Sequence, residues 1–452
     1  MDMVDCERGN RENGEDVTTI YDLNDDCLEC IFERIQDLPT QIQISKCCQR
    51  FQSVILNLWK RQSHHRVLAF NMLPTILQNY DDFGHYLRAL RTEFHTLLII
   101  DDCLNVFLKE MEECGIESLP AVEKCEFHDD VTECYPNDDD IESLSRLVPN
   151  LKYLQITVPI SGRNLTKFHN LEELHLYDEQ TKSIEMDENA FRDVLLSLKN
   201  LRVLDIRNYE CSQLKLSSAI LKCTKLEVLK LNLNTLKPGL DYVLKMPHLK
   251  QLKVLLDQEI DVSQIENVDT HDYMIYETEE YYHILREKGS HILGLAVDFH
   301  FLPVSSTWFK DFRLLNPENL RLLALSNYEF TADEYENCCF PHLEMLCLRH
   351  SEKLHAVTVL EMLHLCPVLK HLDLCYCLNL DKSLLNGLTI FLQNQKRSHA
   401  LCVYYRMSGL EKEIEENSTF WTSQKYLKLL NDIPPDSDIG LSYVQRGFAF
   451  YF

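Results

Sequence analysis

The most regular feature of the sequence is a spacing of apolar residues, Leu-x-x-Leu-x-Leu, that recurs along most of the chain. Alternation of this kind puts leucines on one face of a short strand and polar residues on the other. Weaker copies occur at Leu97/Ile99, Val122/Cys125/Phe127 and Leu401/Val403. The clear copies are Leu151/Leu154/Ile156, Leu171/Leu174/Leu176, Leu201/Leu204/Ile206, Leu226/Leu229/Leu231, Leu249/Leu252/Val254, Ile292/Leu295/Val297, Leu320/Leu323/Leu325, Leu343/Leu346/Leu348 and Leu369/Leu372/Leu374.

Helical periodicity follows several of these expected strands. The apolar helix faces are Phe191/Val194/Leu195/Leu198, Leu240/Val243/Leu244, Leu360/Leu363 and Leu384/Leu388/Leu392. One strand and one helix cannot bury their leucines alone, whereas stacked units share a continuous core. The pattern therefore predicts an α/β fold, a leucine-rich-repeat solenoid with a curved parallel sheet and outer helices. It also accounts for the 74 Leu among 452 residues.

The segment before the repeats has a different pattern. Asn24 is placed to cap a helix, and Asp25 and Asp26 suit the positive end of its dipole. Leu28, Ile31, Phe32 and Ile35 then form an apolar stripe, and after Pro39 a second helical segment runs from Ile42 to Trp59. A segment near 40 residues cannot bury these side chains in a core of its own. It therefore either docks on the first repeat or offers its stripe to another protein.

This segment resembles an F-box. The positions that carry the resemblance are Leu23, Ile31-Phe32, Cys47-Cys48, Arg50-Phe51 and Trp59. Asn24 stands where the family usually has Pro, and Cys47 where it often has Val. The stretch from Cys366 to Cys377 is similar to the repeats that follow F-boxes, so the chain resembles the F-box/leucine-rich-repeat family. The alternative is a helical module that only caps the solenoid.

The resemblance implies a substrate-recognition subunit of an SCF-type (cullin–RING) ubiquitin ligase. Its F-box would bind the S-phase-kinase-associated adaptor and, through it, the cullin and RING subunits, and its repeats would bind a protein substrate for ubiquitination and degradation. A scaffold or inhibitor built on leucine-rich repeats, without a ligase role, is the alternative. The expected adaptor-binding residues are Leu23, Leu28, Ile31, Phe32, Ile35, Ile42, Cys48, Phe51 and Trp59.

If the repeats stack, the polar positions of the strands line the concave face. These are the expected substrate-binding residues: His175, Tyr177, Asp205, Arg207, Lys230, Asn232, Lys253, Asp298, Arg349, His371 and Asp373. The expected organisation is a disordered acidic arm over 1–18, the F-box over 19–62, about 11–13 repeats over 63–410, and a cap over 411–452. In this cap a helix over 411–430 precedes an aromatic end at 447–452, which either closes the solenoid or packs back across it.

The charge of the chain limits which classes of partner it can bind. The formal net charge is −26, which disfavours nucleic acid and anionic membranes, because both attract Lys and Arg. Two acidic inserts, 126–142 and 257–280, hold no Lys or Arg and interrupt the repeat rhythm. They are either solvated loops, the second with an ordinary repeat helix over 273–288, or functional inserts. A functional insert would favour a basic substrate.

Catalytic motifs are not found. The sequence contains no glycine-rich phosphate loop, nucleophile elbow or zinc-protease motif. The pair Cys27 and Cys30 lacks a second pair at zinc-like spacing, so no metal, cofactor or catalytic residue is expected. Without an export signal or an apolar run near 18 residues, we expect a chain in the cytoplasm or nucleus with reduced thiols.

Overall fold

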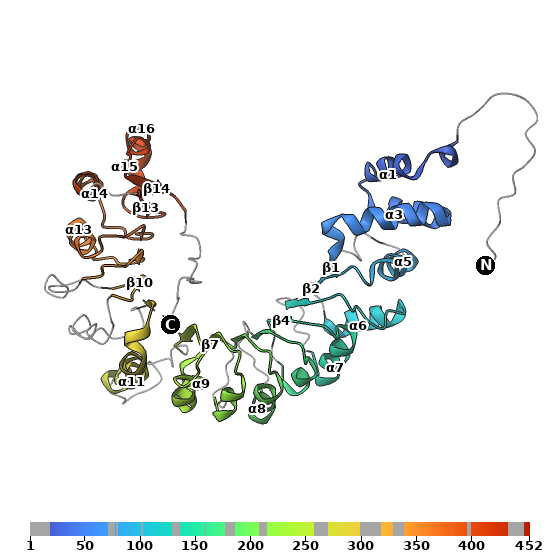
Figure 1. Cartoon of the computed structure of the whole chain (residues 1–452), viewed down its shortest axis with the longest axis horizontal. Coiled ribbons are helices and arrows are strands. Elements are labelled where there is room, and N and C mark those ends of the chain that lie inside the picture. Colours follow the sequence, from blue (N-terminus) through green and yellow to red (C-terminus); the bar gives the residue numbers. More distant parts are fainter. Residues whose placement is uncertain are drawn as a thin grey trace, which may run out of the picture.

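The computed structural model describes residues 19–70, 77, 80–100, 103–128, 136–158, 160–176, 186–207, 215–256, 270–298, 318–328, 339–395, 399–432 and 447–452. The described strands form one 15-stranded sheet, and all neighbours are parallel except where β15 enters. Figure 1 shows an arc with the strands on its inner side and the helices outside. This is the leucine-rich-repeat solenoid that the spacing predicts.

All nine clear copies of the repeat, and the three weaker ones, form strands in consecutive order. The apolar positions of each strand point into the core, and the positions between them point to the inner side of the arc. The strands are β1 (Val67–Ala69), β2 (Thr96–Ile100), β3 (Lys124–His128), β4 (Tyr153–Ile156), β5 (Glu173–Leu176), β6 (Val203–Asp205), β7 (Val228–Asn232), β8 (Gln251–Leu255), β9 (Gly294–Asp298), β10 (Leu322–Ser326), β11 (Met345–Cys347), β12 (His371–Asp373), β13 (Leu401–Tyr404), β14 (Leu427–Leu430) and β15 (Gly447–Tyr451).

Helices cover the outer face of the sheet, and the expected apolar helix faces lie in α8, α10, α13 and α14. The 3-10 helices are η1 (Ile20–Asp22), η2 (Ser63–Arg66), η3 (Arg163–Lys167), η4 (Ser218–Lys222), η5 (Lys237–Gly239) and η7 (Gly289–His291). The α-helices are α1 (Asp25–Glu33), α2 (Leu38–Cys47), α3 (Gln49–Arg61), α5 (Tyr80–Leu90), α6 (Leu104–Glu113), α7 (Asp138–Leu147), α8 (Glu188–Ser197), α9 (Leu233–Leu236), α10 (Leu240–Val243), α11 (Thr270–Lys288), α13 (Ala356–Leu365), α14 (Lys382–Gln395), α15 (Glu411–Glu416) and α16 (Ser418–Thr422).

The N-terminal module consists of α1, α2 and α3. Asn24 caps α1 as expected, because its side chain accepts a hydrogen bond from the Cys27 amide at 2.8 Å. The expected second helical segment is two helices, since Cys48 is extended and separates α2 from α3. One hydrophobic core runs without a break from Leu28 in this module to Phe450 near the C-terminal end.

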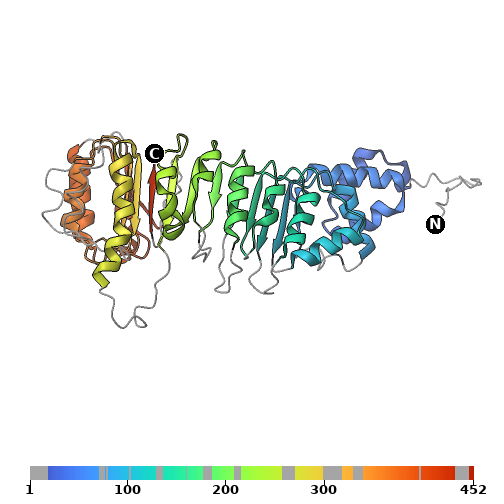
Figure 2. The same cartoon turned by 90° about the horizontal axis from the view of Figure 1, so that it is seen from below.

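The C-terminal region corrects the expected cap. The helix expected over 411–430 ends at Thr422, and the residues after it form β14 at the end of the sheet. The aromatic end, β15, lies between β8 and β9 in the middle of the sheet and is antiparallel to both. Figure 2 shows this red strand between the green and yellow parts of the chain. Its place divides the sheet into two parts, here called the N-terminal half-sheet (β1–β8) and the C-terminal half-sheet (β9–β14).

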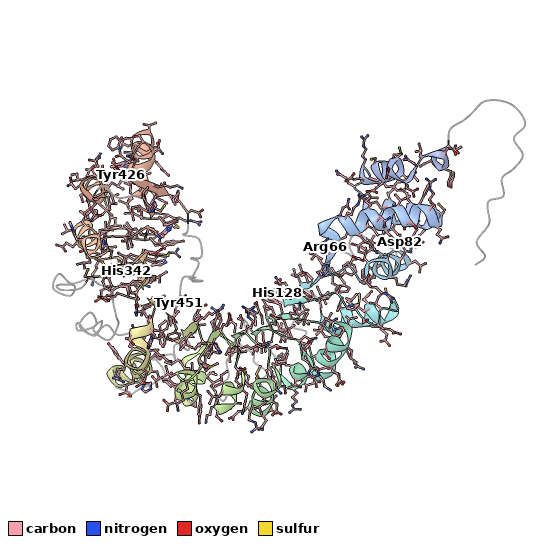
Figure 3. All side chains as sticks on the ribbon, viewed as in Figure 1. Arg66, Asp82, His128, His342, Tyr426 and Tyr451 are labelled. Atoms are coloured by element: carbon pink, nitrogen blue, oxygen red, sulfur yellow. The ribbon has the colours of Figure 1, made fainter. Side chains whose placement is uncertain are left out.

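Both faces of β15 are apolar, which explains its position. Phe448 and Phe450 enter the main core, where the Tyr281 ring of α11 packs against them at centroid distances of 5.3 and 5.5 Å. Ala449 and Tyr451 face the inner side and pack with Leu322 in a second apolar cluster. Tyr451 lies on this inner side in Figure 3. A strand that is apolar on both faces is stable only where both are covered, as in the middle of a sheet.

Candidate binding surfaces

The structure places most of the expected adaptor-binding residues inside the N-terminal module. Partly buried are Leu23, Ile35 and Cys48, and Ile31 is 40% exposed. The buried members of the set are Leu28, Phe32, Ile42, Phe51 and Trp59. The apolar stripe is therefore mainly the core of the module, because its helices pack against one another and against the solenoid. Ile31 is the accessible apolar member of the set.

Trp59 joins the module to the solenoid. Its ring packs edge-on against Tyr86 of α5 at 5.3 Å, and its Nε1 donates to Oε1 of Gln41 at 2.6 Å. Asp82 of α5 accepts hydrogen bonds from the amide of Gln43 at 3.0 and 2.8 Å and pairs with Lys46 of α2. Figure 3 shows Asp82 at this junction. The module thus docks on the first solenoid helix through α2 and α3, and α1 lies away from the junction.

The accessible apolar surface of the module lies on η1 and α1. Ile20 is 42% exposed and Tyr21 61%. The Tyr21 ring stacks on Phe51 at 5.4 Å, and Arg50 fixes this segment by donating to the Tyr21 carbonyl at 2.8 Å. We call Ile20, Tyr21 and Ile31 the η1–α1 patch. Sequence reasoning missed Ile20 and Tyr21, because they precede the apolar stripe and no periodicity marks them.

On the inner face, the sheet register brings four of the expected substrate-binding residues together around Asp205. Its carboxylate is 0% exposed and lies 2.7 Å from Nη2 of Arg207, 3.3 Å from Nζ of Lys230 and 3.7 Å from Nδ1 of His175. Burial by itself raises the pKa of Asp205. Contacts from His175 and Arg207 and the charge of Lys230 outweigh burial and hold the pKa below its usual range. The side chains of Arg207 and Lys230 remain 20% and 21% exposed.

A second cluster lies around Asp373 in the C-terminal half-sheet. Asp373 is 0% exposed and pairs with Nε of Arg349, whose side chain is 7% exposed. The Cys375 amide donates to this carboxylate at 3.0 Å, and the Cys347 thiol lies 3.3 Å from it. His371 contacts the Tyr404 hydroxyl at 3.1 Å. The charges of this cluster are enclosed within the fold.

The remaining expected substrate-binding residues do not lie on an open surface. Asn232, Lys253 and Asp298 are buried, so they are not freely accessible surface residues. Asp298 accepts a hydrogen bond from the side chain of Asn327 at 2.7 Å. Tyr177 lies outside the described residues, as do 129–135 and 257–269 of the two acidic inserts. The helix expected over 273–288 is part of α11.

A row of alternating charges runs along the edge where the strands begin, and sequence reasoning missed it. Lys152 pairs with Glu123 at 2.7 Å, and Arg202 lies 3.8 Å from Glu172. Glu227 then accepts from both Arg202 and Lys250 at 3.2 Å, which holds its pKa below the ordinary value. The signal was available, because these residues directly follow the first apolar position of successive repeats, which is Val122 in one repeat and a leucine in the others. The alternation becomes meaningful only once neighbouring repeats are aligned.

Several buried cysteines offer little reactivity. Burial raises the pKa of the Cys125, Cys223 and Cys377 thiols to about 12 in each case, so they stay protonated near neutral pH. Cys103 is disulfide-bonded, which corrects the expectation that all thiols are reduced. Within the described ranges, no group of three or more His, Cys, Asp or Glu is arranged to hold a metal ion. No helix in these ranges is long and apolar enough to cross a membrane.

Comparisons with known proteins found similarity only at a low level. No model of a protein family matches the sequence, and no curated protein matches it. Three solved structures resemble parts of the arc: the TLR13–ssRNA13 complex (14% identity, TM-score 0.33, covering 73% of this chain and 38% of that one), the Toll–Spatzle complex of Drosophila (16%, 0.39, 74% and 46%), and the yeast Rad7–Elc1 complex (13%, 0.31, 90% and 93%). This chain spans less than half the length of the first two. The chain is a leucine-rich-repeat solenoid by its own strands and register.

Proposed function

We propose that the chain is the substrate-recognition subunit of an SCF-type ubiquitin ligase. The observation that carries the proposal is a three-helix module that leads directly into a leucine-rich-repeat solenoid and keeps the η1–α1 patch exposed at its outer end. An exposed patch of this kind suits a partner surface. In the proposal the adaptor binds this patch, and the solenoid holds a protein substrate. The chain itself performs no catalytic step, and it works in the cytoplasm or nucleus.

The inner face supports substrate binding by shape and charge. The Asp205 cluster offers Arg207 and Lys230 in fixed positions, since the buried carboxylate orients both. Fixed side chains lose little entropy on binding and therefore favour a specific partner. The Asp373 cluster is enclosed, so we assign substrate contacts to the N-terminal half-sheet rather than to the C-terminal one.

A capture experiment tests the ligase proposal. The full chain should co-purify with the adaptor and cullin, and a variant with Tyr21→Asp and Ile31→Asp should lose both. Phe32 is left unchanged, because it is buried and its replacement would unfold the module. The matched control carries Val357→Asp and Ile390→Asp, two apolar residues on α13 and α14 that are 64% and 62% exposed. It should retain the adaptor.

The same experiment decides between the ligase and a scaffold or inhibitor. The continuous core between the N-terminal module and the solenoid favours this second candidate, because terminal caps of solenoids dock in this way. If the wild-type chain captures no adaptor, the module is a cap and the ligase proposal fails. Equal loss of the adaptor in both double variants would show that the η1–α1 patch is not the binding surface.

A further inference from the structure

The row of alternating charges is interrupted where β15 enters the sheet. Its first part ends at Lys250, whose carbonyl accepts a hydrogen bond from the Phe452 amide at 2.9 Å, and charged residues return at Arg321, Glu344 and Lys370. Phe452 therefore takes the place at which the alternation would require an acid. On the far side of β15, the Leu293 amide donates to the Tyr451 carbonyl at 2.6 Å, so the next residue of the row is apolar as well.

A cavity of about 810 Å³ opens at this interruption. Its floor is apolar: beneath it lie the buried side chains of Val243, Met246, Leu249 and Leu252, and Leu244, Pro247 and Phe452 keep accessible surface. Its volume lies within the range of roughly 300–1,000 Å³ that is usual for small-molecule sites. The walls come from the ends of α10 and α11, from the segments before β6, β7 and β8, and from the beginning of β8.

The rim of the cavity is basic in a strongly acidic chain. Arg202, Lys225, Lys250 and Lys288 line it, and Glu227 is the single acidic side chain among the lining residues. A carboxylate on Phe452 would still leave two positive charges in excess. The chain as a whole has a formal net charge of −26, so the charge of this rim is opposite in sign to that of the chain.

Two cations of the rim, Lys225 and Lys288, have no acidic partner within the described part of the chain. Glu227 is already shared, since Arg202 and Lys250 both lie 3.2 Å from its Oε2. Lys225 donates to the neutral Oδ1 of Asn200 at 2.9 Å. No acidic side chain of the described ranges pairs with Lys225 or Lys288. The cavity thus combines an apolar lining with two lysines, Lys225 and Lys288, that lack acidic partners in the described ranges.

We propose that this cavity binds an amphiphilic anion, with a phosphate or carboxylate head against Lys225 and Lys288 and an apolar group over the floor. The head supplies the negative charge that the row lacks at this point. The apolar group replaces water over Leu244, Pro247 and Phe452, a gain of roughly 25 cal/mol per Å² of apolar surface. The ligand is a soluble organic phosphate or a lipid with the same head. The site is separate from the η1–α1 patch and does not depend on the ligase proposal.

Calorimetric titration of the full chain with three probes tests the two halves of the site. Decyl phosphate should bind with 1:1 stoichiometry and about tenfold more tightly than either decanol or inorganic phosphate, a difference of about 1.4 kcal/mol. If decanol bound as tightly as decyl phosphate, charge would play no role. If inorganic phosphate bound as tightly as decyl phosphate, the apolar floor would play no role. Either result overturns the proposal. This comparison needs no variant, so it does not depend on the folding of one.

Charge reversal then locates the site. A variant with Lys225→Glu and Lys288→Glu should raise the Kd of decyl phosphate about tenfold. The matched control carries Lys152→Glu and Lys370→Glu, which change the net charge equally and lie in the same edge row of other repeats. Equal weakening in both variants would mean unspecific attraction and would overturn the proposal.

Vesicles of phosphatidylcholine with phosphatidic acid distinguish the two sources of the head. Co-sedimentation of the wild-type chain that is lost in the Lys225→Glu, Lys288→Glu variant identifies a lipid. Binding of decyl phosphate without co-sedimentation identifies a soluble ligand. Co-sedimentation that survives in this variant would overturn the assignment of the headgroup to this cavity.

Discussion

Asp205 and Asp373 occupy the same position of the repeat in the two half-sheets, yet their charged neighbours and the exposure of these neighbours differ. Each is the inward-facing residue beside the central leucine of its strand, and each is 0% exposed. Asp205 has three basic neighbours, of which Arg207 and Lys230 stay about one-fifth exposed. Asp373 has one arginine, a thiol and a backbone amide, all enclosed.

The difference shows that the repeat position fixes burial but not charge balance. A buried carboxylate must find counter-charges, because an unpaired one costs several kcal/mol. In the C-terminal half-sheet one arginine supplies this and the cluster is closed. In the N-terminal half-sheet the side chains of Arg207 and Lys230 beside Asp205 remain about one-fifth exposed, so this cluster reaches solvent. The N-terminal half-sheet is therefore the better candidate for substrate contacts.

The comparison assumes that β15 holds both half-sheets in one folding unit. Phe450→Ala should lower the free energy of unfolding by about 4 kcal/mol, because it empties a fully buried ring position between β8 and β9. Urea unfolding measures this. Phe420→Ala, at a ring that is 54% exposed, should change the free energy by about 0.5 kcal/mol or less. A loss under about 1 kcal/mol at Phe450 would mean that the half-sheets are stable without the packing of β15.

Asp373→Asn tests the enclosed cluster. It should cost about 3 kcal/mol, because Arg349 loses its counter-charge where water cannot replace it. The shift in the urea midpoint at constant slope measures the loss. A cost below that of Asp205→Asn would reverse the comparison between the two clusters.

Asp205→Asn should have a smaller effect, about 1–2 kcal/mol near neutral pH, because water can solvate Arg207 and Lys230. Its pH dependence follows from the lowered pKa of Asp205. The contribution of this carboxylate is fully present above the unfolded value of about 4, and it is lost as pH falls through the folded pKa. The difference between wild type and Asp205→Asn should therefore shrink below about pH 4. A difference that stays constant down to pH 2 would contradict a carboxylate stabilised in its charged form.

Much of the fold could be predicted from local pattern. The spacing of leucines located the strands from β2 to β13, because alternation determines which face of a strand is apolar. Asn24 was recognised as a cap, since a side-chain oxygen before an apolar periodic run satisfies free amides at a helix start. The Asp205 cluster was predicted only as a set of separate surface positions. Its members come together because parallel pairing brings equivalent positions of neighbouring repeats side by side.

The sequence by itself determined the repeat, which face of each strand points to the core, and the net negative charge of the chain. Tertiary structure alone decided which apolar residues stay accessible: Phe32 and Trp59 are buried, whereas Tyr21 and Ile31 are exposed. It also placed β15 beside β8, from which it is separated by most of the C-terminal half of the chain. The physical reason is the same in both cases. A local pattern shows that a face needs cover, but the element that covers it is chosen by packing between distant segments.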